Sequence, residues 1–306
     1  MAIILSDHQY GKAETHLVRI VRDTARHEIR DLNVSTALRG AFETAYLTGD
    51  QSTVLPTDTQ KNTAYAFAKK HGISSPEEYG LILANHFVND VEPVTGARVE
   101  IEEFSWERVE IDGVEHDHTF TRKGPGIRTA AITVEQTPQG LSQQVIGGLK
   151  DFVILKSTGS EFAGFLTDEY TTLEETHDRV MATSLVAKWR FDPTAVADGT
   201  LAYEAIYPKV LRTLVKEFAE LQSLALQQTL WHMGGAVLDL VPEIVEIRLQ
   251  APNKHHFVVD LSRFGLDNDN EVFHADDRPY GLIEATIAQD GAPGAGSAWR
   301  PSAGLA

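Results

Sequence analysis

The 306-residue chain contains no cysteine. This absence excludes disulfide bonds, thiolate zinc sites, iron–sulfur clusters and cysteine nucleophiles. The sequence also lacks any apolar run of about 18 residues, the length that spans a bilayer. Its first residues, Met1 to Asp7, carry neither a basic leader nor a long apolar region. We therefore expect a cytoplasmic protein that is neither secreted nor embedded in a membrane.

Basic residues are scarce, with 27 lysines and arginines against 44 aspartates and glutamates and a formal net charge of −17. This charge repels nucleic acid and anionic lipid, so neither is an expected partner. A small anionic substrate would need a local basic pocket. The hydrophobic share of 42% is typical of a globular chain, long enough for one large domain or two ordinary ones.

The first half of the chain is predicted to contain two strands, two helices and two further strands, in that order. Hydrophobic periodicity predicts strands at 12–21, 27–38, 98–111 and 116–134 and helices at 58–71 and from Pro76 onward. Asp58 and Ser75 are the predicted N-caps of the two helices, and Gly72 is the predicted stop of the first.

The second half repeats this order loosely. Strands are predicted at 152–156, 183–191, 244–249 and 255–261, and helices are predicted between them at 203–221 and 229–241. We therefore expect two units, 1–140 and 141–288. The remaining segment, 289–306, is too poor in apolar residues to pack and is expected to be mobile. It does not end in Ser-Lys-Leu, the peroxisomal address.

Two polar clusters could carry chemistry. The stretch 54–63 combines polar side chains with a helix amino terminus, which suits an oxyanion or an anionic heterocycle, although an ordinary capped helix has the same pattern. The stretch 251–257 contains His255, which could shuttle protons near neutral pH.

Metal ligation has little support in the sequence. The adjacent His255 and His256 face opposite ways in a strand, whereas His116 and His118 could share a face. No third ligand stands at a clear spacing, and we interpret the latter pair as the polar face of a strand. Arg179 and Gln227 are more suggestive chemically, because guanidinium and carboxamide groups can each pair with adjacent donor and acceptor atoms on a purine.

Taken in order, eight segments between residues 8 and 288 resemble the urate oxidase family. They are YGK at 10–12, TDTQKNT at 57–63, LKSTGSEF at 155–162, GF at 164–165, DEYTTL at 168–173, DR at 178–179, PNKH at 252–255 and RPYG at 278–281. Each segment alone is weak, but all of them in sequence across almost the whole chain are highly specific.

The resemblance implies the tunnelling fold, an α+β architecture in which each chain holds two tandem units of antiparallel sheet with helices on the outer face. Dimers would close the sheet into a barrel, and two barrels would stack into a homotetramer. Active sites would then lie between subunits. One chain would supply Lys12, Thr57 and Asp58, and another would supply Phe162, Arg179, Leu226, Gln227 and Asn253.

The resemblance also implies a role for each of these residues in oxidising urate with dioxygen and water to 5-hydroxyisourate and hydrogen peroxide. Phe162 would stack on the purine, while Arg179 and Gln227 would hold its opposite edges and the backbone amides of Leu226 and Asp58 would add donors. Asn253 and Thr57 would border the space for oxygen or water. Lys12, Thr57 and His255 would form a proton relay.

The implied reaction needs no metal and no cofactor, because doubly deprotonated urate can give one electron to oxygen directly. Two departures from the family pattern are present. Leu226 is a conservative change at a backbone contact, and Ala163 replaces a larger residue beside Phe162, which affects the shape of the pocket.

Two rival interpretations belong to other classes. One is a different tunnelling-fold enzyme acting on a pterin or a guanine nucleotide, which would usually need zinc; the lack of cysteine weighs against it. The other is a purine-binding homologue without turnover, and the presence of Lys12, Thr57 and His255 weighs against that.

Overall fold

An antiparallel sheet of nine strands runs through the part of the chain that the computed structural model describes, residues 3–124, 126–276 and 278–300. The strands follow the order β1-β2-β3-β6-β7-β8-β9-β10, and β11 also pairs with β9. Their bounds are β1 Tyr10–Val21, β2 Glu28–Gly40, β3 Val94–Glu103, β6 Ile127–Thr137, β7 Gly140–Lys156, β8 Met181–Phe191, β9 Ile244–Val258, β10 Phe273–Asp276 and β11 Leu282–Ala288.

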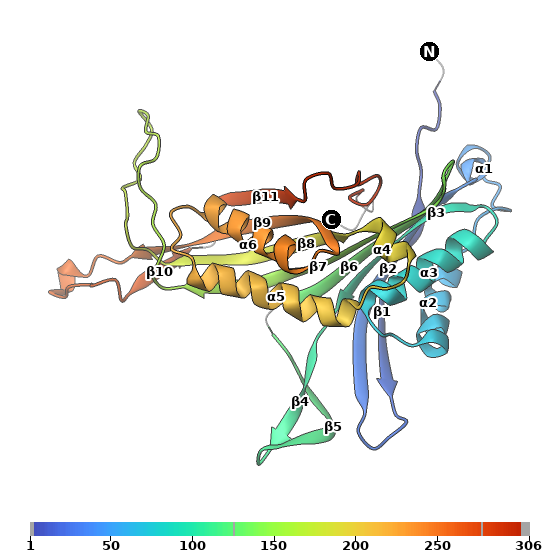
Figure 1. Cartoon of the computed structure of the whole chain (residues 1–306), viewed down its shortest axis with the longest axis horizontal. Coiled ribbons are helices and arrows are strands. Elements are labelled where there is room, and N and C mark those ends of the chain that lie inside the picture. The colour runs from blue at the N-terminus through green and yellow to red at the C-terminus, as the bar shows by residue number, and fades with distance from the viewer. Residues whose placement is uncertain (1–2, 125, 277, 301–306) are drawn as a thin grey trace.

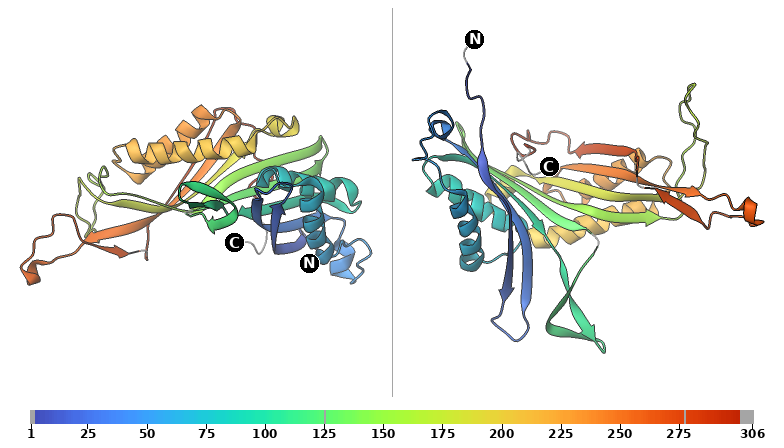
Figure 2. Two further views of the ribbon diagram at one scale, coloured as in Figure 1. Left: turned by 90° about the horizontal axis from the view of Figure 1, so that it is seen from below. Right: turned by 180° about the vertical axis from the view of Figure 1, so that it is seen from behind.

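Four long helices cover one face of this sheet (Figure 1). They are α2 Thr57–His71, α3 Pro76–Asp90, α5 Tyr203–Glu220 and α6 Leu226–Leu240, and the short helices α1 Glu43–Leu47 and α4 Pro193–Ala197 connect strands to them. Viewed from behind, the strands lie in front of the helices (Figure 2). The expected α+β class, with antiparallel strands and helices on one face, is confirmed. None of the described helices is long and apolar enough to cross a membrane.

The hydrophobic core lies between the sheet and the helices. In β3, Ala97, Val99 and Ile101 alternate with polar residues, so the three apolar side chains share the face that α3 covers and all are buried. Tyr79 and Leu83 approach from α3 and are fully buried. Each large apolar side chain buried in this way contributes roughly 1.5–3 kcal/mol to stability.

The helix boundaries follow capping chemistry, with one correction. The Ser75 side chain accepts a hydrogen bond from the Glu78 amide, which confirms it as the N-cap of α3. Asp58 was wrongly predicted to cap α2, because the helix begins one residue earlier and Pro56 is its N-cap. The Asp58 carboxylate instead accepts hydrogen bonds from Lys61 and Asn62 in the following turn.

The strands predicted at 98–111 and 116–134 are each divided in the structure. After β3 the chain leaves the sheet at Phe104 and forms a separate hairpin, β4 Trp106–Ile111 and β5 Val114–Arg122, before returning as β6. The departure is fixed by Asp31, whose carboxylate accepts a hydrogen bond from Trp106 Nε1 and whose carbonyl accepts one from the Phe104 amide.

In the second half, the strands predicted at 244–249 and 255–261 are joined in one continuous strand, β9, which ends at Val258 rather than at 261. Helix α6 begins at Leu226 rather than at 229. Strands β10 and β11 were not predicted. The observed order β7, β8, α5, α6, β9, β11 nevertheless parallels the order β1, β2, α2, α3, β3, β6 of the first half.

Residues 289–300 lie on the sheet face opposite the helices. The Arg98 guanidinium on β3 donates to the carbonyl of Ala298 at 2.9 Å, and Arg190 on β8 donates to the carbonyl of Pro293 at 2.8 Å. Both arginines alternate with residues of the core, so they point away from it. This segment was expected to be too poor in apolar residues to pack, but in 289–300 buried arginines bind its backbone carbonyls. Residues 301–306, also assigned to the tail, lie outside the described residues.

Candidate active site

A cavity of about 640 Å³ opens where β7 and β9 end and β8 begins, in the second half of the chain. Its volume is in the range of sites that hold small molecules. Six of the residues that the sequence singled out line it: Phe162, Arg179, Leu226, Gln227, Asn253 and His255. They come from four separate stretches of the sequence, so the fold brings them together.

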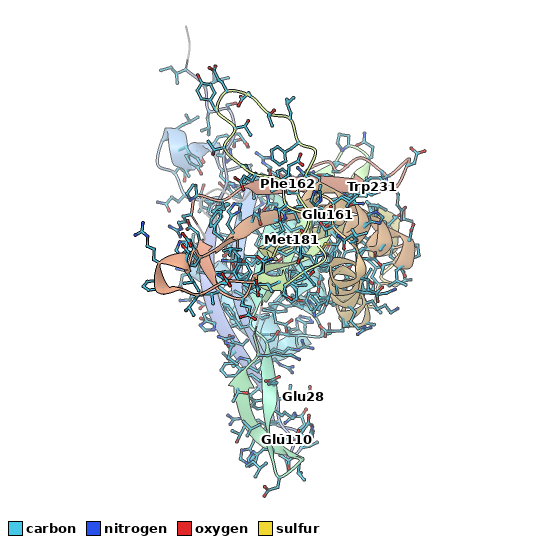
Figure 3. The ribbon with its side chains drawn as sticks, turned by 90° about the vertical axis from the view of Figure 1, so that its left-hand side faces the viewer. Glu28, Glu110, Glu161, Phe162, Met181 and Trp231 are labelled. Carbon is cyan, nitrogen blue, oxygen red and sulfur yellow. The ribbon has the colours of Figure 1, made fainter. Side chains whose placement is uncertain are left out.

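The Phe162 ring is held at the base of a protruding loop. Phe162 exchanges two backbone hydrogen bonds with Thr176, at 2.7 and 2.9 Å, and this pairing closes the loop between them. Figure 3 shows Phe162 beside Glu161 at this base, with Met181 below them. Phe165 stacks on the Phe162 ring, with centroids 4.8 Å apart and planes inclined by 15°. An aromatic stacking surface is therefore already ordered here.

Arg179 supplies the positive charge of the cavity. The central carbon of its guanidinium lies 5.3 Å from the Phe162 ring centroid, and its Nε donates to the Ser160 hydroxyl at 3.2 Å. Burial lowers the pKa of Arg179, although a guanidinium remains charged at any physiological pH. The cavity thus holds a fixed cation in spite of the negative net charge of the whole chain.

The amino terminus of α6 supplies backbone donors. Leu226 is the first residue of this 15-residue helix and is buried, whereas the Gln227 side chain is exposed to the cavity. The first amides of a helix have no partner within it and carry the positive end of the helix dipole. This end of the cavity is therefore suited to an anion.

Strand β9 supplies Asn253 and His255 to the cavity. Residues two apart on a strand face the same side, which explains why both reach it. The His255 ring stacks on the Phe257 ring with centroids 5.6 Å apart, and the Asn253 backbone N–H donates to the Gly281 carbonyl at 2.8 Å.

Lys12, Thr57 and Asp58 do not line this cavity. They lie together at the junction of β1 and α2, where the hydrogen bond from the Lys61 ammonium and, less strongly, the charge of Lys12 lower the pKa of the Asp58 carboxyl. Figure 1 places β1 and α2 at the opposite end of the chain from β10. In a single chain, therefore, the predicted site residues form two separate groups, and the proposed relay of Lys12, Thr57 and His255 is divided between them.

His116 and His118 lie on β5, in the projecting hairpin, with ring centroids 4.5 Å apart. Within 3–124, 126–276 and 278–300, no group of three or more histidine, aspartate or glutamate side chains is arranged to hold a metal ion. The interpretation of this pair as a strand's polar face agrees with its place on the hairpin.

Several residues of the site were not predicted from the sequence. Phe165 belongs to a matched segment, but no pattern indicated that its ring would stack on Phe162. Ser160 and Ser223 are fully buried and pair their backbones in a short parallel bridge beside Arg179. Small buried hydroxyls of this kind leave no periodic signal in a sequence.

Comparison with known proteins places this geometry in context. The family profile described as uricase matches residues 8–133 and 145–284. The uricase of Arthrobacter globiformis is 49% identical over 303 residues, covering 99% of this chain and 96% of that protein. The uricase of Dictyostelium discoideum is 37% identical over 286 residues, covering 92% and 96%. The crystal structure of the Arthrobacter globiformis uricase superposes with a TM-score of 0.89 and covers 96% of this chain and 98% of that one.

Proposed function

The chain belongs to the uricase family and is a urate oxidase that uses dioxygen, and we propose that two copies of it complete each active site. The observation that carries this proposal is the division of the site residues. The cavity holds Phe162 and Arg179, whereas Lys12 and Thr57 lie at the other end of the chain. A second subunit that presents its Lys12 end to this cavity would unite the two groups.

The cavity side binds urate in this proposal. The purine stacks on Phe162, and Arg179 and Gln227 hold opposite edges of the ring by paired hydrogen bonds. The amide of Leu226 at the start of α6 adds a donor toward the anion, as does the partner's Asp58 amide at the start of α2. The fixed charge of Arg179 supports this assignment, because the substrate is an anion.

The Lys12 side moves protons. Lys12 and Thr57 would meet His255 across the subunit boundary and form a relay that removes protons from urate. Asn253 and Thr57 would border the space above the ring in which oxygen, and later water, is held. Protein groups need only deprotonate, orient and exclude bulk water.

The chemistry itself follows from the substrate. Doubly deprotonated urate gives one electron to dioxygen, the two radicals combine at ring carbon five, peroxide leaves, and water adds at that carbon. Urate, dioxygen and water thus give 5-hydroxyisourate and hydrogen peroxide.

We propose that no metal or cofactor takes part. Exhaustive chelation should leave urate oxidation intact, and activity restored only by an added metal would contradict this.

The assembly that fits the divided site is a homotetramer of two stacked barrels. Among the described residues, no further strand pairs with β1 at one edge of the sheet or with β10 and β11 at the other, and pairing with a second chain would close these edges. We further propose a cytoplasmic location, supported by the cysteine-free composition.

The direct test of the activity mixes the protein with urate under air. Loss of urate absorbance should be accompanied by release of one hydrogen peroxide for each urate consumed. Binding of urate without its consumption would indicate a purine-binding protein, and consumption without peroxide would indicate another reaction.

A further inference from the structure

We infer that Ser160 is a positioning residue that fixes the guanidinium of Arg179 for urate, an inference that rests on the proposed role of Arg179. Ser160 is fully buried, two residues before Phe162. Its hydroxyl accepts the Nε–H of Arg179 at 3.2 Å, and its carbonyl accepts the Arg179 backbone amide at 2.9 Å. Backbone and side chain of Arg179 are thus both bound to one residue.

The chemical nature of this partner is significant. A guanidinium has five N–H donors, and the Ser160 contact uses the one on Nε, which leaves the four on the two Nη atoms. Among the described residues, no carboxylate lies within ion-pair distance of Arg179. A carboxylate at this position would neutralise the cation and compete with the urate anion. A neutral hydroxyl orients the group and preserves its charge.

The Ser160 hydroxyl is itself fixed by buried neighbours. It lies 3.6 Å from the sulfur of Met181, toward which its own hydrogen is directed, so its lone pairs face Arg179. The Ser223 hydroxyl is also 3.6 Å from that sulfur and 2.7 Å from the Thr229 hydroxyl. Ser160, Met181, Ser223 and Thr229 are each at most 1% exposed. This cluster is therefore packed too tightly for the serine to reorient freely.

The same cluster connects the two groups that would hold the purine edges. Ser160 and Ser223 form a parallel bridge, in which the Glu161 amide donates to the Ser223 carbonyl at 2.7 Å. Thr229 lies in the first turn of α6, two residues after Gln227. Ser160 thus links Arg179 to the helix start that carries Gln227, which sets the separation of the two purine-binding side chains.

The test measures urate binding in the absence of oxygen, so that no turnover occurs. Ser160→Ala should weaken binding about tenfold, equivalent to about 1.4 kcal/mol, because the guanidinium loses its orientation. Ser160→Thr and Ser160→Val form a matched pair of nearly equal volume, of which only threonine keeps the hydroxyl. Threonine should bind urate more tightly than valine by a similar factor, and this comparison remains informative if the alanine protein does not fold.

A double-mutant cycle separates positioning from a general structural effect. Arg179→Lys retains the charge but lacks Nε–H, so Ser160→Ala should cost no further affinity in that background, while its effect on the melting temperature should persist. Unchanged affinity of Ser160→Ala alone, or the same loss in both backgrounds, would overturn the inference. If Arg179→Lys itself binds urate normally, the proposed function of Arg179 fails instead, so the two failures are distinguishable.

Discussion

At the scale of single residues, Arg179 and Lys12 have different kinds of environment. Arg179 is half-buried in a cavity and bound to Ser160, whereas Lys12 is half-buried on edge strand β1, with its backbone amide donating to the Thr36 hydroxyl. In the proposed assembly, Arg179 holds the ligand in place, whereas Lys12 approaches it from a second subunit. Replacing Arg179 and replacing Lys12 should therefore affect different properties of the enzyme.

Replacing Arg179 should impair binding. Arg179→Ala removes hydrogen bonds to an anion that contribute roughly 1.5–3 kcal/mol each, so anaerobic urate binding should weaken at least tenfold. Calorimetry measures this directly. Arg212→Ala is the matched control, because Arg212 is exposed on α5 and does not line the cavity. Equal urate affinity of the Arg179→Ala and Arg212→Ala proteins would show that Arg179 does not bind urate.

Replacing Lys12 should impair chemistry. Lys12→Met keeps the apolar stem but removes the base, so turnover should fall by roughly a hundredfold or more while anaerobic urate binding changes little. A higher pH should partly restore turnover, because more of the urate then arrives already deprotonated. Steady-state rates across a pH series give this result. Lost binding with retained turnover at saturating urate would reverse the two roles.

At the scale of elements, the start of α3 depends on a single buried hydroxyl. Ser75→Ala removes the acceptor for the Glu78 amide and should lower the free energy of unfolding by about 1 kcal/mol. Ser74→Ala is the control, since Ser74 is the exposed neighbour and does not cap the helix. Denaturant titration of both proteins measures the difference. Equal midpoints would mean that the cap contributes nothing to stability.

The elements that the sequence predicted well are those with strong local signals. Helix α3 has a capping serine followed by proline, and α2 is terminated by its C-cap Gly72, whose φ of 79° suits glycine. The elements that were missed depend on distant partners. Strand β9 continues through the polar residues Asn253 to His256 because β8, β10 and β11 pair with it, and no local pattern contains that information.

The candidate site was also predictable only in part, because its residues could be identified from the sequence but their contacts could not. The matched segments indicated which residues to examine, and six of them line one cavity. The contacts that order those residues were not predictable, because Ser160 meets Arg179 and Ser223 only after three segments fold together. The separation of Lys12 from the cavity likewise depends on the length and order of the whole sheet.

At the scale of the whole molecule, the parallel order of elements in the two halves supports our proposal of two units, 1–140 and 141–288. Arg128 on β6 joins them, since its guanidinium contacts Glu77 on α3 and Glu204 on α5, each at 2.7 Å. In our proposal each half carries one part of the active site, and the ion pair of the buried Arg128 with the partly exposed Glu204 connects the halves.

The divided site predicts complementation between two inactive proteins. Lys12→Ala and Arg179→Ala should each be nearly inactive alone, but random co-assembly should restore about a quarter of the wild-type activity, because one in four sites draws both intact halves. Differently tagged chains, co-expressed and purified through both tags, provide the mixed assembly for the peroxide assay.

The control for that experiment is a mixture of the two proteins purified separately and kept from exchanging subunits, which should remain inactive. Complete inactivity in assemblies shown to contain both chains would place every catalytic group within one subunit.

The segment 289–300 has a consequence for how the gene could be rearranged. It crosses the sheet from the second half toward the first, where Ser297 contacts Glu135 on β6 and Arg300 contacts Asp7 ahead of β1. Arg300 therefore lies beside Asp7. A circular permutant could connect Arg300 to Asp7 through a linker and open at the exposed turn near Gln139, between β6 and β7. Such a permutant would exchange the order of the two halves in the sequence. It would break the covalent link between β6 and β7 at that turn but would keep every strand pairing.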